Sequence, residues 1–409
     1  MFLFMSLISK KVHVSELRLG MYVSKLDRDW LDTPFLLQGF TVESEDDIDV
    51  IHEYCEHVWI EAVNEKRSPF ETLETGEYKK RPARYINKLP AQDEHRKAIG
   101  VYKASQAITK NILATISLQG TIKTDEAKEV VNECVDSVIR NPNALIWMSK
   151  VREVDEYTSE HCLNVCIYAI TFGRHLGIDE EELKTLGLCA MLHDVGKMRV
   201  PQHILNKKEK LTEREFSMIK AHTVHGRKLL MSTPGMPAAA VDVAYGHHER
   251  MDGSGYPRKI KATGISDFSR IVAIVDAYDA MTAERCYAPA MPSTQALNII
   301  FKDRGTHFDE HYAIEFIKCI GLYPPGTLVE LNNDRVAIVL AANPKQSRLP
   351  KIITVLDENK ARCSEKVYNL KDVNSGSLDT GFLIKRALVD GAYGVTIKEY
   401  QEQGLIFAK

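Results

Sequence analysis

Apolar residues in the middle of the chain recur at the spacing of a helix. Ile108, Ile112 and Ile116 are four residues apart, and a similar stripe runs from Val130 to Ile139 before Asn141-Pro142 interrupts it. Such spacing places apolar side chains on one face of a helix. We therefore predict a bundle of amphipathic helices from about residue 98 to residue 320, with further stripes at 163–176, 183–192, 216–230, 238–245, 271–281 and 314–320.

The two ends of the chain have a different pattern. Residues 11–63 contain short strand-like runs at 12–14 and 58–60, with a predicted helix from Glu45 to Cys55 between them. The stretch from residue 66 to residue 96 is rich in charge and lacks periodicity, which is typical of a linker. After residue 326, apolar runs at 328–331, 336–340 and 352–356 are separated by polar turns, as in short strands.

These patterns predict a mainly α protein. The predicted fold is a helical-bundle domain with a small α+β N-terminal module and a small β-rich C-terminal appendage. The expected boundaries are 1–65 for a regulatory module, 66–96 for the charged linker, 97–320 for the helical domain and 321–409 for the C-terminal extension.

Composition narrows the class of protein. The net charge of −3 argues against a general DNA-binding protein, which would have a basic surplus. The eight cysteines contain no Cys-x-x-Cys pair, as expected of a reduced, cytoplasmic protein. The apolar start, residues 1–8, is far shorter than the roughly 20 residues of a membrane span. We expect a soluble cytoplasmic protein that binds neither DNA nor membrane.

Metal-capable side chains gather in the helical region. Asp194 and Asp276 each follow an apolar run, and a buried carboxylate is costly unless it is paired or bound to a cation. A lone histidine is more often structural, so the combination carries the signal. Imidazoles with carboxylates suit Fe, Mn, Ni or Zn better than Ca, and helical bundles commonly build di-metal sites. The candidate ligands are His161, His193, Asp194, His222, His247, His248 and Asp276.

Two further features suit a phosphate ligand. Lys197 follows Asp194 by three residues, so its ammonium can lie beside a metal-bound oxygen. The tight loop 253–257, Gly-Ser-Gly-Tyr-Pro, begins five residues after His248. Such a loop is often an ordinary turn, but its position next to a ligand pair favours the rim of a site.

Several of these segments resemble a known family. Residues 192–197, LHDVGK, match the His-Asp signature of HD-superfamily phosphohydrolases, and residues 247–257, HHERMDGSGYP, resemble the signature of the HD-GYP family. Residues 204–207, 220–226 and 276–282 also match, in the same order, within a signature core of residues 150–320. Segments near residues 20–23 and 30–40 resemble a small domain often found upstream of HD-GYP domains.

The resemblance implies roles for these residues. It implies two divalent metals, most often iron or manganese, and a hydroxide between them that attacks phosphorus in line. His161, His193, Asp194 and Asp276 would hold one metal, and His222, His247 and His248 the other, with Asp194 as the bridge. Lys197 would neutralise phosphate charge; with Asp194 it forms the predicted catalytic pair. Substrate contacts are expected from Lys197, Gly255, Tyr256, Arg285 and Asp279, the last of which could instead orient a ligand.

A third metal is doubtful on the sequence. Members that bind three ions have a glutamate four residues before the first histidine, and Tyr157 stands there in this chain. A phenol with an ordinary pKa near 10 is a poor ligand at neutral pH.

The resemblance implies a phosphodiesterase that opens cyclic di-GMP to linear pGpG and then, in some members, to GMP. A related substrate, 3',3'-cyclic GMP-AMP, stays open. So does a non-catalytic module that senses cyclic dinucleotides or docks diguanylate cyclase domains through the Gly-Tyr-Pro loop. The full set of metal ligands favours the enzyme. The sequence does not decide between a monomer and a homodimer.

Overall fold

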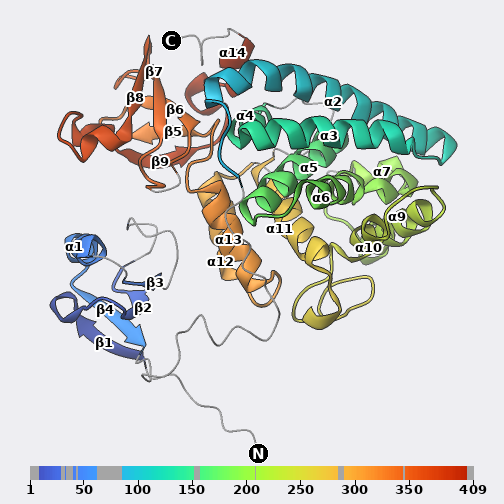
Figure 1. Cartoon of the computed structure of the whole chain (residues 1–409), viewed down its shortest axis with the longest axis horizontal. Coiled ribbons are helices and arrows are strands. Elements are labelled where there is room, and N and C mark those ends of the chain that lie inside the picture. Colours follow the sequence, from blue (N-terminus) through green and yellow to red (C-terminus); the bar gives the residue numbers. More distant parts are fainter. Residues whose placement is uncertain are drawn as a thin grey trace, which may run out of the picture. The chain divides into compact units, whose positions relative to one another are not determined.

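The computed structural model describes residues 9–28, 33, 40–42, 45–61, 85–151, 157–207, 209–283, 290–343 and 346–402. The chain forms two compact units, Met1–Lys80 and Arg81–Lys409, which are described separately (Figure 1).

The first unit is a small antiparallel sheet with one helix. The strands β1 (Ser9–His13), β2 (Tyr22–Leu26), β3 (Phe40–Thr41) and β4 (His57–Glu61) lie in the order β1-β4-β2-β3. Val12, Val23 and Val58 bury one face of this sheet together with Ile51 of helix α1 (Glu45–Tyr54). The predicted α+β module is therefore confirmed, and its helix and last strand lie where the sequence predicts them.

The second unit begins with a helical region. Figure 1 shows α2 alongside α3, and α5 and α6 beneath them. The helices are α2 (Ala91–Gln119), α3 (Thr124–Arg140), α4 (Pro142–Met148), α5 (Tyr157–His175), α6 (Glu180–Leu192), α7 (Gln202–Leu205), α8 (Glu213–Lys220), α9 (His222–Met231), α10 (Ala238–Gly246), α11 (Asp267–Thr282), α12 (Ser293–Lys302) and α13 (Glu310–Ile320), with a short 3-10 helix η3 (Val195–Arg199) after α6.

Local sequence signals set the ends of these helices. The Asn141 side chain accepts a hydrogen bond from the Asn143 amide, and Pro142 occupies the first turn of α4, so α3 ends and α4 begins at this pair. The Asp179 carboxylate caps α6 in the same way. Gly120 ends α2 with a φ of 68°, a left-handed conformation that glycine adopts at little cost.

The first helix begins earlier than the sequence pattern indicates. α2 starts at Ala91, inside the segment predicted as a linker up to residue 96. Glu94 is completely buried and accepts hydrogen bonds from Arg140 Nε and Ser137 Oγ, both at 2.7 Å. The partners of Glu94 lie more than 40 residues away in the sequence, so the sequence alone does not distinguish it from a solvent-exposed charge. For this reason the sequence pattern places the start of α2 in the linker.

Three helices form the centre of the bundle. α5, α6 and α11 are buried on nearly every side, and the rings of Tyr168 on α5 and Tyr278 on α11 meet edge to face with centroids 5.3 Å apart. Cys162, Cys166 and Cys189 are free, buried thiols in this core. The metal-capable residues thus stand on rigid elements. None of the described helices combines the length and the apolar character that crossing a bilayer requires.

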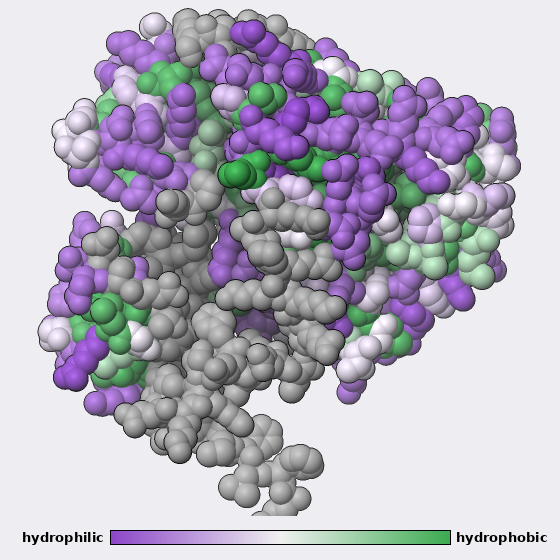
Figure 2. Space-filling view, in the orientation of Figure 1, coloured by the Kyte–Doolittle hydropathy of each residue, from purple (hydrophilic) through white to green (hydrophobic). Residues whose placement is uncertain are grey.

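The second unit ends in a five-stranded antiparallel sheet. Its strands are β5 (Leu328–Leu331), β6 (Val336–Ala341), β7 (Lys351–Leu356), β8 (Arg362–Asn369) and β9 (Ile384–Leu388), in the order β8-β7-β6-β5-β9. The β-rich C-terminal appendage is therefore confirmed. Helix α14 (Ile397–Glu402) follows, and Gln401 Nε2 donates to Met148 Sδ of α4 at 3.1 Å. On the face that Figure 2 shows, the described residues are largely hydrophilic, with scattered apolar patches.

Candidate metal centre

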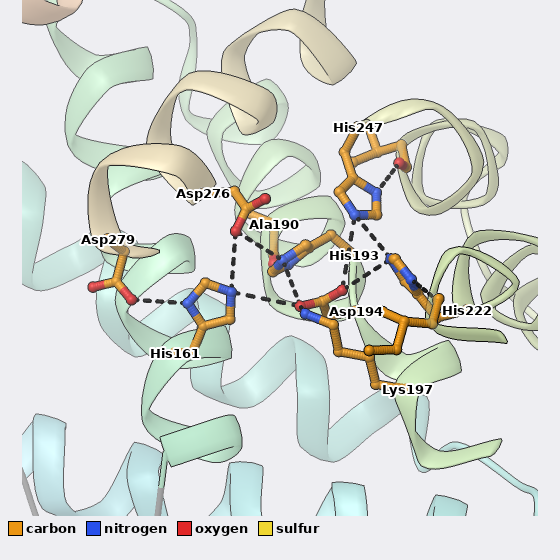
Figure 3. A network of polar contacts seen from close by, with 11 residues as sticks. His161, Ala190, His193, Asp194, Lys197, His222, His247, Asp276 and Asp279 are labelled. Atoms are coloured by element: carbon orange, nitrogen blue, oxygen red, sulfur yellow. Dashed lines mark hydrogen bonds and ion pairs between the residues drawn. The ribbon is translucent and has the colours of Figure 1, made fainter. Parts of the chain in front are cut away.

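The predicted ligands come from five places in the helical region and converge; Figure 3 shows them except for His248. α5 supplies His161, the end of α6 supplies His193 and Asp194, and His222 is the first residue of α9. His247 and His248 follow α10, and Asp276 lies on α11. Their ligand atoms form two groups, within each of which all atoms lie within 4.8 Å of one another: Asp194, His222, His247 and His248, and His161, His193 and Asp276.

Asp194 lies between the two groups. Its Oδ2 is 3.3 Å from His193 Nε2 and 3.5 Å from His161 Nε2. Its Oδ1 is 3.2 Å from His222 Nε2 and 3.8 Å from His247 Nε2. One carboxylate oxygen therefore faces each group, which is the arrangement that a bridging ligand needs.

The orientation of three imidazoles is set by hydrogen bonds to backbone carbonyls on the side away from the site. Nδ1 of His193 donates to the Ala190 carbonyl at 2.6 Å, and Nδ1 of His222 donates to the Ile219 carbonyl at 2.7 Å. His247 does the same with the carbonyl of residue 243 at 2.9 Å. A proton on Nδ1 leaves Nε2 with its lone pair directed into the site, as metal-binding histidines require.

The protonation states of two histidines and of Asp194 fit the same picture. Burial lowers the pKa of His222 to about 4 and of His248 to about 3, so both are neutral at pH 7. Burial also raises the pKa of Asp194, but the Lys197 ammonium and the surrounding imidazoles outweigh it and hold that pKa well below its usual range. His161 differs: burial lowers its pKa, yet hydrogen bonds to three carboxylates raise it to about 10.

The donor set fits divalent metal ions. His193 Nε2 and Asp194 Oδ1 are buried and make no hydrogen bond within the described part of the chain. Buried polar atoms without hydrogen-bond partners are costly, and a cation would satisfy both. Nitrogen and carboxylate oxygen ligands together suit iron, manganese or zinc.

A glycine allows α9 to approach the His193–Asp194 segment. A Cβ on Gly196 would lie 1.9 Å from the His222 carbonyl oxygen and 2.5 Å from the Gly226 amide nitrogen. Neither backbone group can move aside cheaply, so only glycine lets His222 reach Asp194. Gly196 and Gly226 both lie in segments that match the family, but the sequence alone does not show why a glycine is needed at either position.

Lys197 lies at the site as predicted. Its ammonium donates to Asp194 Oδ2, the carboxylate oxygen that faces His161 and His193. The side chain is 23% exposed, so its other side is accessible to a ligand.

Asp279 does not hold the position of a substrate contact. It is completely buried, and its Oδ2 accepts a hydrogen bond from His161 Nδ1 at 2.8 Å (Figure 3). Of the two roles left open for Asp279, the structure therefore supports the orientation of a ligand. The physical reason is the helical repeat: three residues after Asp276, its side chain points to α5 and lies behind His161.

The Gly-Tyr-Pro loop lies against the same ligands. The Tyr256 ring packs on His248 with centroids 4.7 Å apart, and a Cβ on Gly255 would come within 2.5 Å of the His248 carbonyl oxygen. Glu249, the residue after the His pair, is buried. Its carboxylate accepts backbone hydrogen bonds from Arg258 at 2.6 Å and from residue 260 at 3.2 Å, and so anchors the loop.

Sequence reasoning missed two residues at the rim. Phe216 on α8 is 47% exposed, and Lys220 one turn later lies over its ring at 4.9 Å and over the Tyr256 ring at 5.8 Å. An aromatic residue and a lysine four positions apart on a helix were the available signal.

Some predicted features lie outside the described residues. They are Arg285 and the Tyr157 side chain. The expectation that no third metal binds near Tyr157 therefore stays a prediction.

Comparison with known proteins gives consistent matches. Residues 143–312 match the model of the HD domain, and residues 9–127 match a domain of unknown function, DUF3391. The cyclic di-GMP phosphodiesterase PA4108 of Pseudomonas aeruginosa is 34% identical over 356 residues, which cover 84% of each chain. The 3'3'-cGAMP-specific phosphodiesterase 3 of Vibrio cholerae is 35% identical over 168 residues, 41% of this chain and 36% of that protein. A solved structure of an HDG"Y"P protein from Bdellovibrio bacteriovorus aligns with a TM-score of 0.47 at 16% identity, over 76% of this chain and 98% of that one.

Proposed function

The chain belongs to the HD-GYP family of the HD phosphohydrolases, and we propose that it is a metal-dependent phosphodiesterase that hydrolyses cyclic di-GMP. The observation that carries the proposal is the convergence of all predicted ligands into two groups that share Asp194. The product is linear pGpG, with further cleavage to GMP as a second step.

The proposed cofactor is a pair of divalent ions, iron or manganese. His161, His193 and Asp276 would hold one, and His222, His247 and His248 the other, with Asp194 between them. Bound there, the ions would supply Lewis-acid polarisation of the phosphodiester and an activated water as nucleophile.

The chain's own residues bind and orient the substrate. Lys197 carries a positive charge at the edge of the site, and we propose that it pairs with a phosphate oxygen and stabilises the charge that develops there. Tyr256 offers a ring at the rim, and its loop lies against residues 248–250 because Gly255 has no side chain there. The Gly255 backbone is proposed to contact the substrate. Arg285 is proposed to contact phosphate or guanine through its planar fork of donors.

A second candidate substrate is 3',3'-cyclic GMP-AMP, because relatives named for that activity match the helical region. The relative that matches along most of this chain is named for cyclic di-GMP, which favours cyclic di-GMP as the substrate. Docking of diguanylate cyclase domains through the Gly-Tyr-Pro loop, and a homodimer, remain predictions.

Hydrolysis of cyclic dinucleotides tests the proposal. Protein purified without oxygen is incubated with cyclic di-GMP or 3',3'-cyclic GMP-AMP, with and without Fe(II) or Mn(II), and the products are separated by chromatography. We expect metal-dependent conversion of cyclic di-GMP to pGpG, and no conversion by Asp194→Ala at equal protein concentration. Metal-loaded protein that leaves both substrates intact would contradict an enzymatic function.

Lys197 is tested by a separate pair of variants. Lys197→Ala should keep its metal content and lose about a hundredfold in turnover, the effect of removing one preorganised charge. Lys228→Ala, which removes an exposed lysine from α9, is the matched control and should be fully active. Unchanged turnover in Lys197→Ala would exclude the proposed role.

Metal analysis tests the number of ions. We expect two per chain in protein prepared without oxygen. A reproducible third ion near Tyr157 would contradict the expectation of two metals.

A further inference from the structure

The first unit carries a tryptophan between two lysines on neighbouring strands. In the sheet, Lys11 of β1 and Lys25 of β2 each pair in register with Trp59 of the central strand β4. The ammonium of Lys11 lies 5.5 Å from the centroid of the Trp59 ring, and that of Lys25 lies 4.8 Å from it. Residues far apart in sequence thus form one cluster of an aromatic ring and two cations.

This cluster lies on the face of the sheet opposite the core. Val12 and Val58, next to Lys11 and Trp59 along their strands, are buried in the core of the unit. Because successive side chains of a strand point to opposite faces, Lys11 and Trp59 point away from that core. Lys11 and Lys25 are exposed, and Trp59 is partly buried.

An irregularity in β2 brings Lys25 to this face. Val23 and Leu26 are both core residues although they are three positions apart, which a regular strand does not allow. The register shifts between Val23 and Lys25, so Ser24 is the extra residue and Lys25 pairs with Trp59. β-bulges of this kind re-aim a side chain, and they are common next to binding sites.

Two histidines extend the same face. His13 and His57 pair in register two residues along β1 and β4, and their rings meet edge to face at 5.4 Å. The nearby Asp27 carboxylate accepts hydrogen bonds from the backbone amides of residues 56 and 57 at 2.9 and 2.8 Å, so its charge is already compensated. We call the set of Lys11, His13, Lys25, His57 and Trp59 the Trp59 patch.

The Trp59 patch is basic and aromatic in a chain whose net charge is −3. An indole ring is a stacking surface for a nucleobase, and lysines beside it neutralise phosphate. Because neighbouring strands are about 4.8 Å apart, the three strands that carry the patch span about 10 Å, the size of one base with its phosphate. We propose that the outer face of the N-terminal sheet binds a nucleotide, with the base against Trp59 and the phosphate held by the ammonium groups of Lys11 and Lys25.

The proposal assigns a ligand to the unit that precedes the metal centre, and it does not depend on hydrolysis. The two lysines lie against the ring in the free protein through cation–π contacts. A nucleotide would replace these contacts: its base would stack on the ring, and its phosphate would accept hydrogen bonds from the ammonium groups. Such charge-assisted hydrogen bonds are stronger than the cation–π contacts that they replace.

Tryptophan fluorescence of the full chain, kept free of metal by a chelator, tests the proposal with GMP as the probe. Of the three tryptophans, Trp147 is completely buried and Trp30 is replaced by Phe in every protein that is titrated, so Trp59 is a suitable reporter for this face. We expect a saturable change on addition of GMP that disappears in Trp59→Leu. In Lys11→Ala/Lys25→Ala the reporter stays in place, and the half-saturating concentration should rise about tenfold or more, with a weaker dependence on salt.

Lys10→Ala is the matched control. Lys10 is exposed on the same strand but pairs with Ile60, one position away from Trp59, so it points to the other face. Its titration should match that of the unaltered chain, and circular dichroism of every variant should show an intact fold.

Three results would overturn the proposal. The first is the absence of any saturable change at millimolar GMP. The second is an equal response to inorganic phosphate, which would show that the base is not recognised. The third is much tighter binding of a single-stranded oligonucleotide, which would identify a nucleic-acid surface instead of a site for one nucleotide.

Discussion

Among single residues, Asp279 is the one whose position behind a candidate ligand, His161, is clearest only in the structure. Its buried carboxylate accepts the Nδ1 proton of His161 and so keeps Nε2 directed at Asp194 and Asp276. A carboxylate behind a metal-binding imidazole also raises the basicity of the ligand. We therefore propose that Asp279 acts on a bound metal through His161 and does not contact the substrate.

Replacing Asp279 by Asn tests this role. The amide lacks the negative charge, so we expect metal affinity to fall about 10- to 100-fold and turnover at limiting metal to fall with it. Competition with a chelator measures the affinity. Asp267→Asn, at the exposed start of the same helix, is the control and should bind metal normally. A residue that touched substrate would instead change KM and leave metal affinity unaltered.

The chemistry of single residues was largely predictable. The seven ligand candidates could be named from the sequence because histidines and aspartates within apolar stripes are unusual and occur in a family order. What Asp279 and Glu249 contact was not predictable, because each role depends on a backbone or ring that the fold brings from another element.

Among the elements, the contact between η3 and α9 brings the two ligand groups together. Gly196 of η3 and Gly226 of α9 have no side chains, so the two backbones can touch. This contact places His222 Nε2 3.2 Å from Asp194 Oδ1. A wider separation would move one group of ligands away from the carboxylate that both groups share.

Gly196→Ala should therefore disable the site without unfolding the bundle. The added Cβ would overlap the His222 carbonyl, so α9 must move outward by more than an ångström. We expect loss of at least one metal equivalent and of most activity, with helical circular dichroism retained. Gly100→Ala on α2, where a Cβ would meet no atom within 4 Å, is the control and should be active and slightly more stable.

The elements differ in how far the sequence predicts them. Helices with a continuous apolar stripe, such as α5, α6 and α11, were expected close to where they lie, because helical periodicity is a strong signal. β8 alternates between exposed and partly buried positions and has few apolar residues, so it resembled a polar turn region. β9, α12 and the start of α2 were not predicted either.

At the scale of the whole molecule, the second unit begins before its first helix. Tyr85 donates its hydroxyl proton to the Ile178 carbonyl at 2.9 Å, and the Lys88 amide donates to the Arg140 carbonyl at the same distance. The segment that precedes α2 is thus attached to the bundle. Its polar sequence conceals this, since backbone and hydroxyl hydrogen bonds leave no hydrophobic pattern.

Truncation measures the contribution of this segment. Two shortened chains, one starting at residue 81 and one at Ala91, should both retain the metal centre. The shorter chain should have a free energy of unfolding lower by about 2 kcal/mol, since at least two hydrogen bonds are lost at about 1 kcal/mol each. Urea unfolding followed by circular dichroism gives the difference. Equal stabilities would mean that the segment is only loosely attached.

The hydrogen bonds behind the metal-facing imidazoles also bear on how the site can evolve. His193, His222 and His247 are held by backbone carbonyls, which every amino acid possesses, so a codon change at the acceptor position leaves the acceptor in place. His161 is held by the side chain of Asp279, which one nucleotide change can replace. Natural variation in ligand strength should therefore accumulate around His161, while the other three histidines keep the same orientation across divergent descendants.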